Sequence, residues 1–403
     1  MNSTTTTTTP FEAAAPAAPA APMWPGVISL ALGTFSLVTS EFLPATLLTR
    51  MAQDLHVSEG AAGQAVTATA IMGAVAALVA GLLTRRFDRR AVVLWISALL
   101  TVSNVAVCVA PGLGTLLVAR LVLGAALGAF WSMSAALTTR LVPPALVPKA
   151  MSIVLAGVSA ATVCAAPAGA LMGEWWGWRA VFAAAAGLGV LTLLAQLVWL
   201  PSMPPSAPVS LRSLAQGTRI PGVRLGLVMT LLVAAGHFAG FTYIRPFLER
   251  VPQFAGPELS AALLAFGIAG FLGNVAGAAA VGRSVVATVA AAPAGIALAC
   301  VLLAAFGTWD PLSYAMIAFW GFAFGAVPIA LQTWMTKVAP DHLESVGGVF
   351  VATFQVSITL GSIGGGLLLD HAGAYSPMLL AAAATGLGAL VFWRRGAKVH
   401  ALS

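Results

Sequence analysis

Glu41 is an acidic residue about 17 positions into an apolar stretch that begins at Trp24. A carboxyl group inside a membrane costs at least ~2–3 kcal/mol unless it is protonated, paired or open to a water-filled cavity. Alternating exposure to water and to a nearby cation would let such a group take up and release a proton near neutral pH. Glu41 is therefore a candidate proton carrier. A fixed ion pair and a solvated residue near the helix end are the alternatives.

Two basic residues could act with this carboxyl group. Arg120 is about 6 Å from the outer end of the stretch 116–139, and Glu41 is about 12 Å from the outer end of its own, at 1.5 Å per residue. An arginine side chain can close this gap, which predicts an ion pair; the alternative is an arginine that holds backbone carbonyls. His237, in the stretch 223–247, has a side chain that titrates near neutrality, although a lone helical histidine more often only satisfies a hydrogen bond.

The hydrophobic pattern predicts the elements that position these residues. Of 403 residues, 60% are hydrophobic and only 8% are charged, and the charges fall in gaps between twelve apolar stretches. About 20 apolar residues in a helix match the ~30 Å hydrocarbon core of a bilayer. We therefore expect an all-α polytopic membrane protein with 12 transmembrane helices. These span 24–48, 61–84, 91–110, 116–139, 149–173, 178–200, 223–247, 259–281, 285–306, 310–334, 345–369 and 375–394.

A Pro- and Ser-rich segment divides the twelve stretches into two sets of six. Residues 201–222 are predicted to be a cytoplasmic linker between an N-terminal bundle, 23–200, and a C-terminal bundle, 223–395. Residues 1–22 contain no Lys or Arg and no apolar block, which predicts a disordered tail rather than a signal peptide. Residues 396–403 are predicted to be a C-terminal tail.

The two halves resemble each other where their fifth helices end. The string Gly-Ala-Leu-Met-Gly-Glu at 169–174 has an echo in Gly-Gly-Leu-Leu-Leu-Asp at 365–370, about half a chain length later. Together with the 6+6 count and the central linker, this echo favours a duplicated, pseudo-symmetric transporter fold with its site near the midplane.

Basic residues indicate the orientation in the membrane. With the N-terminus in the cytoplasm, about 14 Lys and Arg face inward and about three face outward, and the reverse orientation would invert that bias. This distribution predicts that both termini are cytoplasmic. It also explains the +7 net charge without a nucleic-acid partner, because the basic residues recur in alternate loops rather than in one dense stripe.

Small residues mark the predicted helix contacts. Gly124 and Gly128 are one turn apart, and Gly169 belongs to a stripe of small residues that recurs every four positions in 149–173. In lipid, such residues let backbones approach closely, so packing is the simplest interpretation and sliding or rocking of helices is the functional one. Pro167 removes an internal hydrogen bond and permits a bend.

Several of these strings resemble motifs of the major facilitator superfamily. The run from Gly81 to Asp88, Arg89 and Arg90 is similar to its signature between the second and third helices, and Arg120 with the two glycines that follow is similar to its helix 4 motif. The run around Pro167 and Gly169 resembles the helix 5 motif of its proton antiporters.

The loop signature departs from the family pattern. Arg85 takes the place of the usual acid, Asp88 that of the second glycine, and Ala166 that of the glycine before Pro167. In the family the loop acid helps to hold the outward-open state. Asp88 is the acid that remains here to pair with a neighbouring arginine.

From the first predicted helix to the twelfth, the chain resembles the purine nucleoside exporters of the drug:proton antiporter group. The most specific strings are at 41–44, 51–55, 130–134, 140–144, 147–150 and 241–246. The resemblance implies proton-coupled efflux (antiport) of purine ribonucleosides such as inosine or guanosine across the bacterial inner membrane by alternating access. Sugar or drug efflux by the same mechanism is the alternative.

Aromatic, amide and hydroxyl side chains in the helices suit a nucleoside, because rings stack on the base and polar groups bind the base edge and the ribose. No dense set of cations lies within the helices, which disfavours phosphorylated nucleotides. Aromatic residues in membrane helices are also often interface belts or packing. The predicted cavity residues are Trp131, Ser134, Phe241, Arg245, Trp320, Gln332 and Gln355.

Other functional classes fit less well. The helices contain no His/Glu metal pattern, no phosphate-binding loop and no nucleophile with a positioned base, so an enzyme is disfavoured. A receptor or scaffold is disfavoured because no sizeable soluble domain is present. The expectation is a monomeric secondary transporter that uses the proton motive force, binds no metal or cofactor, and contacts protons, a nucleoside-like small molecule and membrane lipid.

Overall fold

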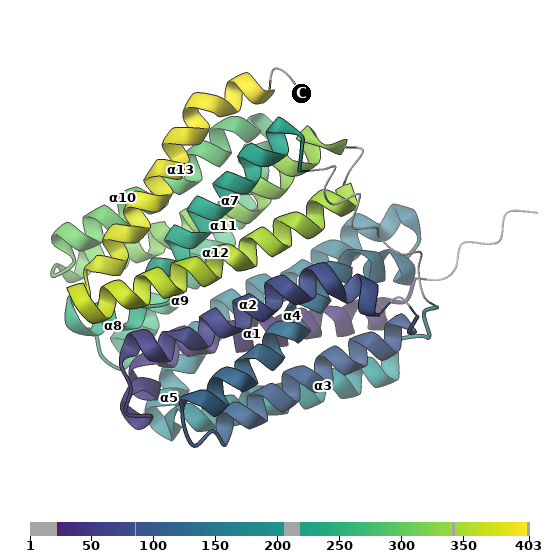
Figure 1. The fold of residues 1–403 in the computed structure, drawn as a ribbon, viewed down its shortest axis with the longest axis horizontal. Helices are drawn as coiled ribbons and strands as arrows, with labels where there is room; N and C mark the ends of the chain where they lie inside the picture. Colours follow the sequence, from purple (N-terminus) through teal and green to yellow (C-terminus); the bar gives the residue numbers. More distant parts are fainter. Residues whose placement is uncertain (1–21, 85, 205–217, 341–342, 401–403) are drawn as a thin grey trace, which may run out of the picture.

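The apolar stretches form long helices in the computed structural model, which describes residues 22–84, 86–204, 218–340 and 343–400 (Figure 1). No β-strand occurs in these ranges. The elements are α1 (Trp24–Asp54), α2 (Glu59–Leu83), α3 (Arg89–Cys108), α4 (Leu113–Leu141), η1 (Pro144–Leu146), α5 (Val147–Trp199), α7 (Pro221–Phe241), α8 (Ile244–Arg250), α9 (Pro257–Arg283), α10 (Val285–Phe306), α11 (Asp310–Val338), α12 (Leu343–Ala372) and α13 (Ser376–His400).

Eleven of the helices in the described part of the chain are long and apolar enough to cross a membrane, and one of them contains two spans. Helix α5 has 53 residues and is interrupted at Gly177, where φ is 79° and ψ is 160°. A positive φ of this kind is accessible to glycine at little cost, so the chain kinks at this residue. The kink falls between the predicted helices 149–173 and 178–200, and the predicted all-α membrane fold is confirmed.

The seventh predicted helix, 223–247, is broken in the structure. Helix α7 ends at Phe241, and the short α8 begins at Ile244. Pro246 has no N–H to donate to the carbonyl four residues earlier, which weakens a continuous helix at this point. The prediction of one uninterrupted helix was therefore wrong.

Several predicted boundaries also shift. Helix α1 continues to Asp54, six residues past its predicted end, and α13 continues to His400 through part of the predicted tail. The predicted N-terminal tail, except for its last residue, and positions 205–217 of the predicted linker lie outside the described residues.

The exterior of the helix assembly is apolar, as lipid contact requires. Large apolar side chains point outward on many helices, while polar side chains such as Asn104, Arg120 and Gln196 are buried. The most exposed examples include Trp95, Val118, Leu191, Val198, Leu272 and Trp393.

The helices pack as two groups that meet along two long contacts. Helices α1 to α5 pack mainly on one another, as do α7 to α13. Between the groups, α2 packs against α12 and α5 against α9, and α8 touches α1; α2 and α12 lie side by side in Figure 1. Each contact joins the second long helix of one half to the fifth of the other: α2 to α12, and α9 to the first part of α5. Exchanging the two halves therefore converts one contact into the other.

Glycines bring α2 and α4 together. A Cβ atom at Gly124 would collide with the carbonyl oxygen of Thr69, and one at Gly128 would collide with that of Gly73. Both obstacles are backbone atoms, which cannot move aside as a flexible side chain can. These two glycines were predicted to lie at a helix contact, and the helix that they contact is α2.

We expect Gly128→Ala to lower the free energy of unfolding by about 1–3 kcal/mol, because the new methyl group meets backbone. Gly187 in α5 is the matched control, since a Cβ there has nothing within 4 Å. Gly187→Ala should leave stability unchanged or raise it by about 0.5–1 kcal/mol through helix propensity. Thermal unfolding of the purified protein in detergent, followed by tryptophan fluorescence, measures both. Equal melting temperatures for the two variants would contradict the close α2–α4 contact.

Candidate functional site

Arg120 is fully buried in α4 and binds backbone rather than a carboxylate. Its guanidinium donates to the carbonyl oxygens of Ser40 at 2.9 Å, Glu41 at 3.4 Å and Ala65 at 3.4 Å. Pro44 explains the first contact, because it lacks the N–H that would otherwise bond the carbonyl of Ser40 in α1. Arg120 thus supplies the donor that the proline removes.

Glu41 and Arg120 are close enough to interact through charge, but their side chains form no ion pair within 4 Å in this structure. Glu41 is half-buried, and its carboxyl group has no hydrogen bond to any described residue. The predicted ion pair is therefore absent in this conformation, and the alternative of an arginine that holds carbonyls describes the observed contacts.

A residue that sequence reasoning missed completes this polar group. Asn104 in α3 is fully buried, and its side-chain amide donates to the hydroxyl of Ser40 at 2.8 Å. The signal was available, since Asn104 is an isolated amide in an apolar stretch, and such residues seldom lie in lipid without a partner.

His237 lies inside an aromatic cluster formed by helices of both halves. Its ring stacks on Phe324 with centroids 3.4 Å apart and planes at 2°, and on Phe241 at 5.3 Å and 14°. The indole N–H of Trp320 donates to His237 Nδ1 at 3.1 Å, which places the ring proton on Nε2. We call this group the aromatic cluster; its members are Phe42, His237, Phe238, Phe241, Phe266, Trp320, Phe324 and Phe354.

The structure brings three predicted residues together here, namely His237, Phe241 and Trp320. No carboxylate or cation among the described residues bonds the histidine ring. These surroundings match the alternative interpretation of His237, a histidine that satisfies a hydrogen bond, rather than a proton carrier. Phe42, Phe324 and Phe354 are only half-buried, so these three rings form the partly exposed edge of the aromatic cluster.

Gln355 is only 4% exposed, and its Nε2 has no hydrogen-bond partner. The amide lies in α12 against Gly73 of α2, where the two halves cross. Its neighbour Phe354 contacts Phe238 of the aromatic cluster at 6.1 Å. An unpartnered buried amide beside these rings is a group that could bind a polar ligand once α2 moves away.

Three other predicted cavity residues lie away from the aromatic cluster. Trp131 is half-buried and meets Phe130 edge to face at 6.0 Å, and Ser134 donates to the carbonyl of Trp131 in its own helix at 3.5 Å. Gln332 in α11 is exposed and forms no hydrogen bond to the described residues of the aromatic cluster. The structure brings none of these three into contact with His237.

Arg245 joins α8 to α1 instead of lining a cavity with His237. It is 2% exposed, its Nε donates to Glu249 at 2.7 Å, and another guanidinium nitrogen donates to the carbonyl of Thr46 at 2.6 Å. The hydroxyl of Thr49 donates to the second oxygen of Glu249 at 2.6 Å. In one continuous helix over 223–247, Arg245 would share a face with His237 and Phe241, and the break between α7 and α8 removes this arrangement.

The loop signature holds the start of α3 to the chain that follows α5. Asp88 is the N-cap of α3 and accepts from the N–H of Arg90 at 2.7 Å. It also accepts from the hydroxyl of Ser202 and the N–H of Met203, and these bonds, the first above all, hold the pKa of Asp88 below its usual range. The sequence predicted that Asp88 would pair with a neighbouring arginine side chain. Among described residues, its carboxylate instead accepts from the backbone N–H of Arg90, the hydroxyl of Ser202 and the N–H of Met203.

The remaining signature residues make local contacts. Arg89 donates to the hydroxyl of Thr84 at 2.8 Å, and Arg90 donates to the carbonyl of Leu197 at 2.6 Å. Gly81 lies in the last turn of α2. Arg140 in α4 donates to the carbonyl of Pro204, so residues 202–204 are held to the N-terminal half at several points.

The helix 5 motif packs on α1. A Cβ at Gly169 would come within 2.9 Å of Leu43 Cδ2 and Thr46 Oγ1. Pro167 lies inside α5 two residues earlier and frees the carbonyl of Val163 from its helical bond. Helix α9 crosses at this level, where Gly267 contacts Thr162 and Val163.

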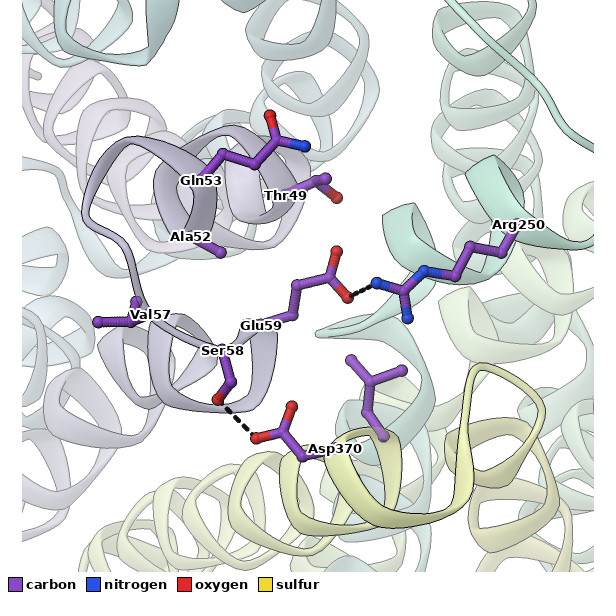
Figure 2. A pocket seen from close by; sticks show the side chains of 9 residues that line it. Thr49, Ala52, Gln53, Val57, Ser58, Glu59, Arg250 and Asp370 are labelled. Carbon is purple, nitrogen blue, oxygen red and sulfur yellow. Dashed lines mark hydrogen bonds and ion pairs between the residues drawn. The ribbon is translucent and has the colours of Figure 1, made fainter.

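A polar cavity of about 410 Å³ lies where α1, α2, α8 and α12 meet (Figure 2). Figure 2 shows Glu59 directed at Arg250, and Ser58 directed at Asp370. Sequence reasoning identified Asp370 through the repeat but did not place it opposite α2. The cavity is lined by Thr49, Ala52, Gln53, Val57, Ser58, Glu59, Arg250, Leu369 and Asp370.

Two paired helical halves with buried polar groups between them are the architecture of a polytopic membrane transporter. The family profile of the Major Facilitator Superfamily matches residues 30–359, and the chain belongs to this superfamily. The motif resemblance noted in the sequence is confirmed.

Relatives of known name match nearly the whole chain. The "Purine ribonucleoside efflux pump NepI" of Escherichia coli O6:H1 is 41% identical over 370 residues, which cover 92% of this chain and 93% of that protein. The proteins of the same name from Escherichia coli strain K12 and from Shigella flexneri are also 41% identical, with the same coverage.

Solved structures share the fold at low identity. A POT family transporter in complex with 5-aminolevulinic acid has a TM-score of 0.76 at 11% identity, covering 94% of this chain and 97% of that one. The human organic anion transporter MFSD10 (TETRAN) has a TM-score of 0.66 at 16% identity, covering 92% and 98%.

The contacts of Arg120 and Glu41 predict a large effect on stability for the first residue and almost none for the second. Arg120→Leu should lower the free energy of unfolding by about 1–3 kcal/mol, because it leaves the carbonyl of Ser40 buried without a donor. Glu41→Gln should change it by less than about 0.5 kcal/mol, because the carboxyl group makes no bond in this conformation. Thermal unfolding in detergent measures both. A large loss of stability in Glu41→Gln would mean that the two side chains are paired after all.

Proposed function

We propose that this chain exports purine ribonucleosides such as inosine or guanosine from the bacterial cytoplasm in exchange for protons. The observation that carries the proposal is the 41% identity, over 92% of the chain, to the purine ribonucleoside efflux pumps. Transport proceeds by alternating access across the inner membrane, with both termini in the cytoplasm and the proton motive force as the only energy source. The orientation rests on the excess of Lys and Arg at the end where α2 and α4 finish.

The aromatic cluster is the proposed site for the base. Its half-buried rings, Phe42, Phe324 and Phe354, come from α1, α11 and α12, so both halves contribute to it. Flat rings stack on a purine, and the amide of Gln355 beside them can bond the polar edge of the base. His237, held by Trp320, presents its Nε2–H as a further donor.

Glu41 is the proposed proton carrier. Its half-buried carboxyl group is the acid adjacent to Phe42, whose ring contacts Phe241 at 5.7 Å. Movement of the base among these rings therefore acts directly on the segment of α1 that carries the acid. Arg120 fixes the backbone of this segment through its bond to the carbonyl of Ser40.

A transport assay tests the proton and substrate assignments together. In everted vesicles containing the protein, inosine uptake should follow an imposed pH gradient and collapse with an uncoupler. Glu41→Gln should abolish this coupled uptake, because an amide cannot carry a proton at neutral pH. Asp310→Asn, at an exposed acid in the first turn of α11, is the control and should transport normally.

Each failure of this assay has a distinct meaning. Uptake of inosine that ignores the gradient would remove the antiport claim, and retained pH dependence in Glu41→Gln would move the proton to another residue. Uptake of sugars or unrelated drugs with no response to nucleosides would replace the substrate class by the alternative one.

Gln355→Met separates a ligand-binding amide from a packing residue. Methionine keeps the chain length and removes the unpartnered amide, so the melting temperature should stay equal or rise. The KM for inosine should rise about tenfold through loss of one hydrogen bond to the base in a desolvated site. Gln332→Met, at an exposed amide, is the matched control and should change neither quantity. Unchanged KM in Gln355→Met would exclude this amide from the site.

A further inference from the structure

Asp370 of α12 holds the beginning of α2 in the opposite half. Its two carboxylate oxygens accept from the hydroxyl of Ser58 at 2.6 Å and from the N–H of Gly60 at 3.0 Å. Ser58 is the N-cap of α2, so the carboxylate lies at the end of this helix where N–H groups lack helical partners. A carboxylate is favoured there by both hydrogen bonding and the helix dipole.

Glu174 of α5 makes the corresponding contact in the other direction. Its Oε1 accepts from the N–H of Gly256 at 3.0 Å, and Gly256 is the N-cap of α9. Gly256 has φ of 49°, and a Cβ at this position would come within 3.0 Å of Glu174 Oε2. Glycine therefore allows the close approach of an acid from one half to a helix start in the other.

The two contacts are equivalent under exchange of the halves. Glu174 closes the 169–174 string and Asp370 closes its echo at 365–370, so each acid ends the repeat motif of its own half. Each holds the first turn of the second long helix of the opposite half. The internal repeat in the sequence thus corresponds to a repeated contact between the halves.

Both contacts lie at the end of the molecule where α1 ends and α2 begins. The other side-chain bonds between the halves lie there too, namely those that join Thr49 to Glu249, Thr46 to Arg245 and Glu59 to Arg250. At the opposite end, where α2 finishes and the linker begins, the bonds of Arg90 and Arg140 stay within the N-terminal half. The side-chain bonds between the halves that involve fully described residues thus gather at one end.

We propose that Glu174 and Asp370 form a double latch that keeps this end closed, and that the end opens only when both carboxylates leave the helix starts they hold. The 410 Å³ polar cavity beside Asp370 and Glu59 admits water to the latch, so the freed carboxylates can be hydrated on opening (Figure 2). In the orientation proposed above, this is the outer end. The latch does not depend on the identity of the substrate.

Distance measurements between spin labels test the latch directly. In a variant with Cys108, Cys164 and Cys300 replaced by alanine, one label pair at Gly114→Cys and Trp309→Cys reports on the latch end. A second pair at Thr139→Cys and Thr336→Cys reports on the opposite end; all four positions are exposed. Pulsed electron paramagnetic resonance gives the populations of short and long distances for each pair.

Glu174→Gln with Asp370→Asn should shift the ratio of short to long distances at the latch end by about tenfold toward long, with the reverse shift at the opposite end. Each single substitution should give an intermediate shift, which keeps the test decisive if the double variant does not fold. Glu258→Gln is the matched control, because Glu258 lies in the first turn of α9 but belongs to the same half as that helix. It should leave both distributions unchanged.

An unaltered latch-end distribution in the single or double variants would overturn the proposal, as would an equal shift in Glu258→Gln. Because the readout is a distance, it is independent of whether the protein transports nucleosides. A failed inosine assay with shifted distances would reject the proposed substrate and retain the latch.

Discussion

The hydrogen bond from Arg120 to the carbonyl of Ser40 is the interaction on which the N-terminal half depends. Pro44 leaves that carbonyl without its helical donor at a depth where no water replaces it. The buried guanidinium of α4 fills the position at 2.9 Å and also reaches the carbonyl of Ala65 in α2. One arginine therefore joins three helices. The same commitment to carbonyls leaves the Glu41 carboxyl group without an ion-pair partner.

Hydropathy predicted the twelve spans because each must be apolar over about 20 residues whatever its neighbours are. The predicted gap between 149–173 and 178–200 contains Gly177, where α5 kinks, and it is flanked by the charged residues Glu174 and Arg179. The break between α7 and α8 was missed, although Pro246 provided a signal in the right position. The role of Arg120 could also have been inferred, since Pro44 frees the carbonyl four residues before it, which is Ser40.

Features that depend on contacts between distant segments could not be predicted from the sequence. Gln332 and Gln355 are both helical amides, and only the packing of α12 on α2 makes the second one buried and unpartnered. Arg245 meets Thr46 because α8 lies against α1, a relation between segments about 200 positions apart. The hydrophobic pattern carries no information on which helices of the two halves are neighbours, because all of them are apolar on most faces.

The anchoring of residues 202–204 has a mechanical consequence for the connection between the halves. Asp88, Arg89 and Arg140 bond this short segment to the N-terminal half, so the chain that leaves α5 stays attached to that half as far as Pro204. Fourteen residue steps separate Pro204 from Thr218, enough for a maximum reach of about 46–50 Å. The covalent connection therefore sets only this upper limit on how far the start of α7 can move from the anchored segment 202–204.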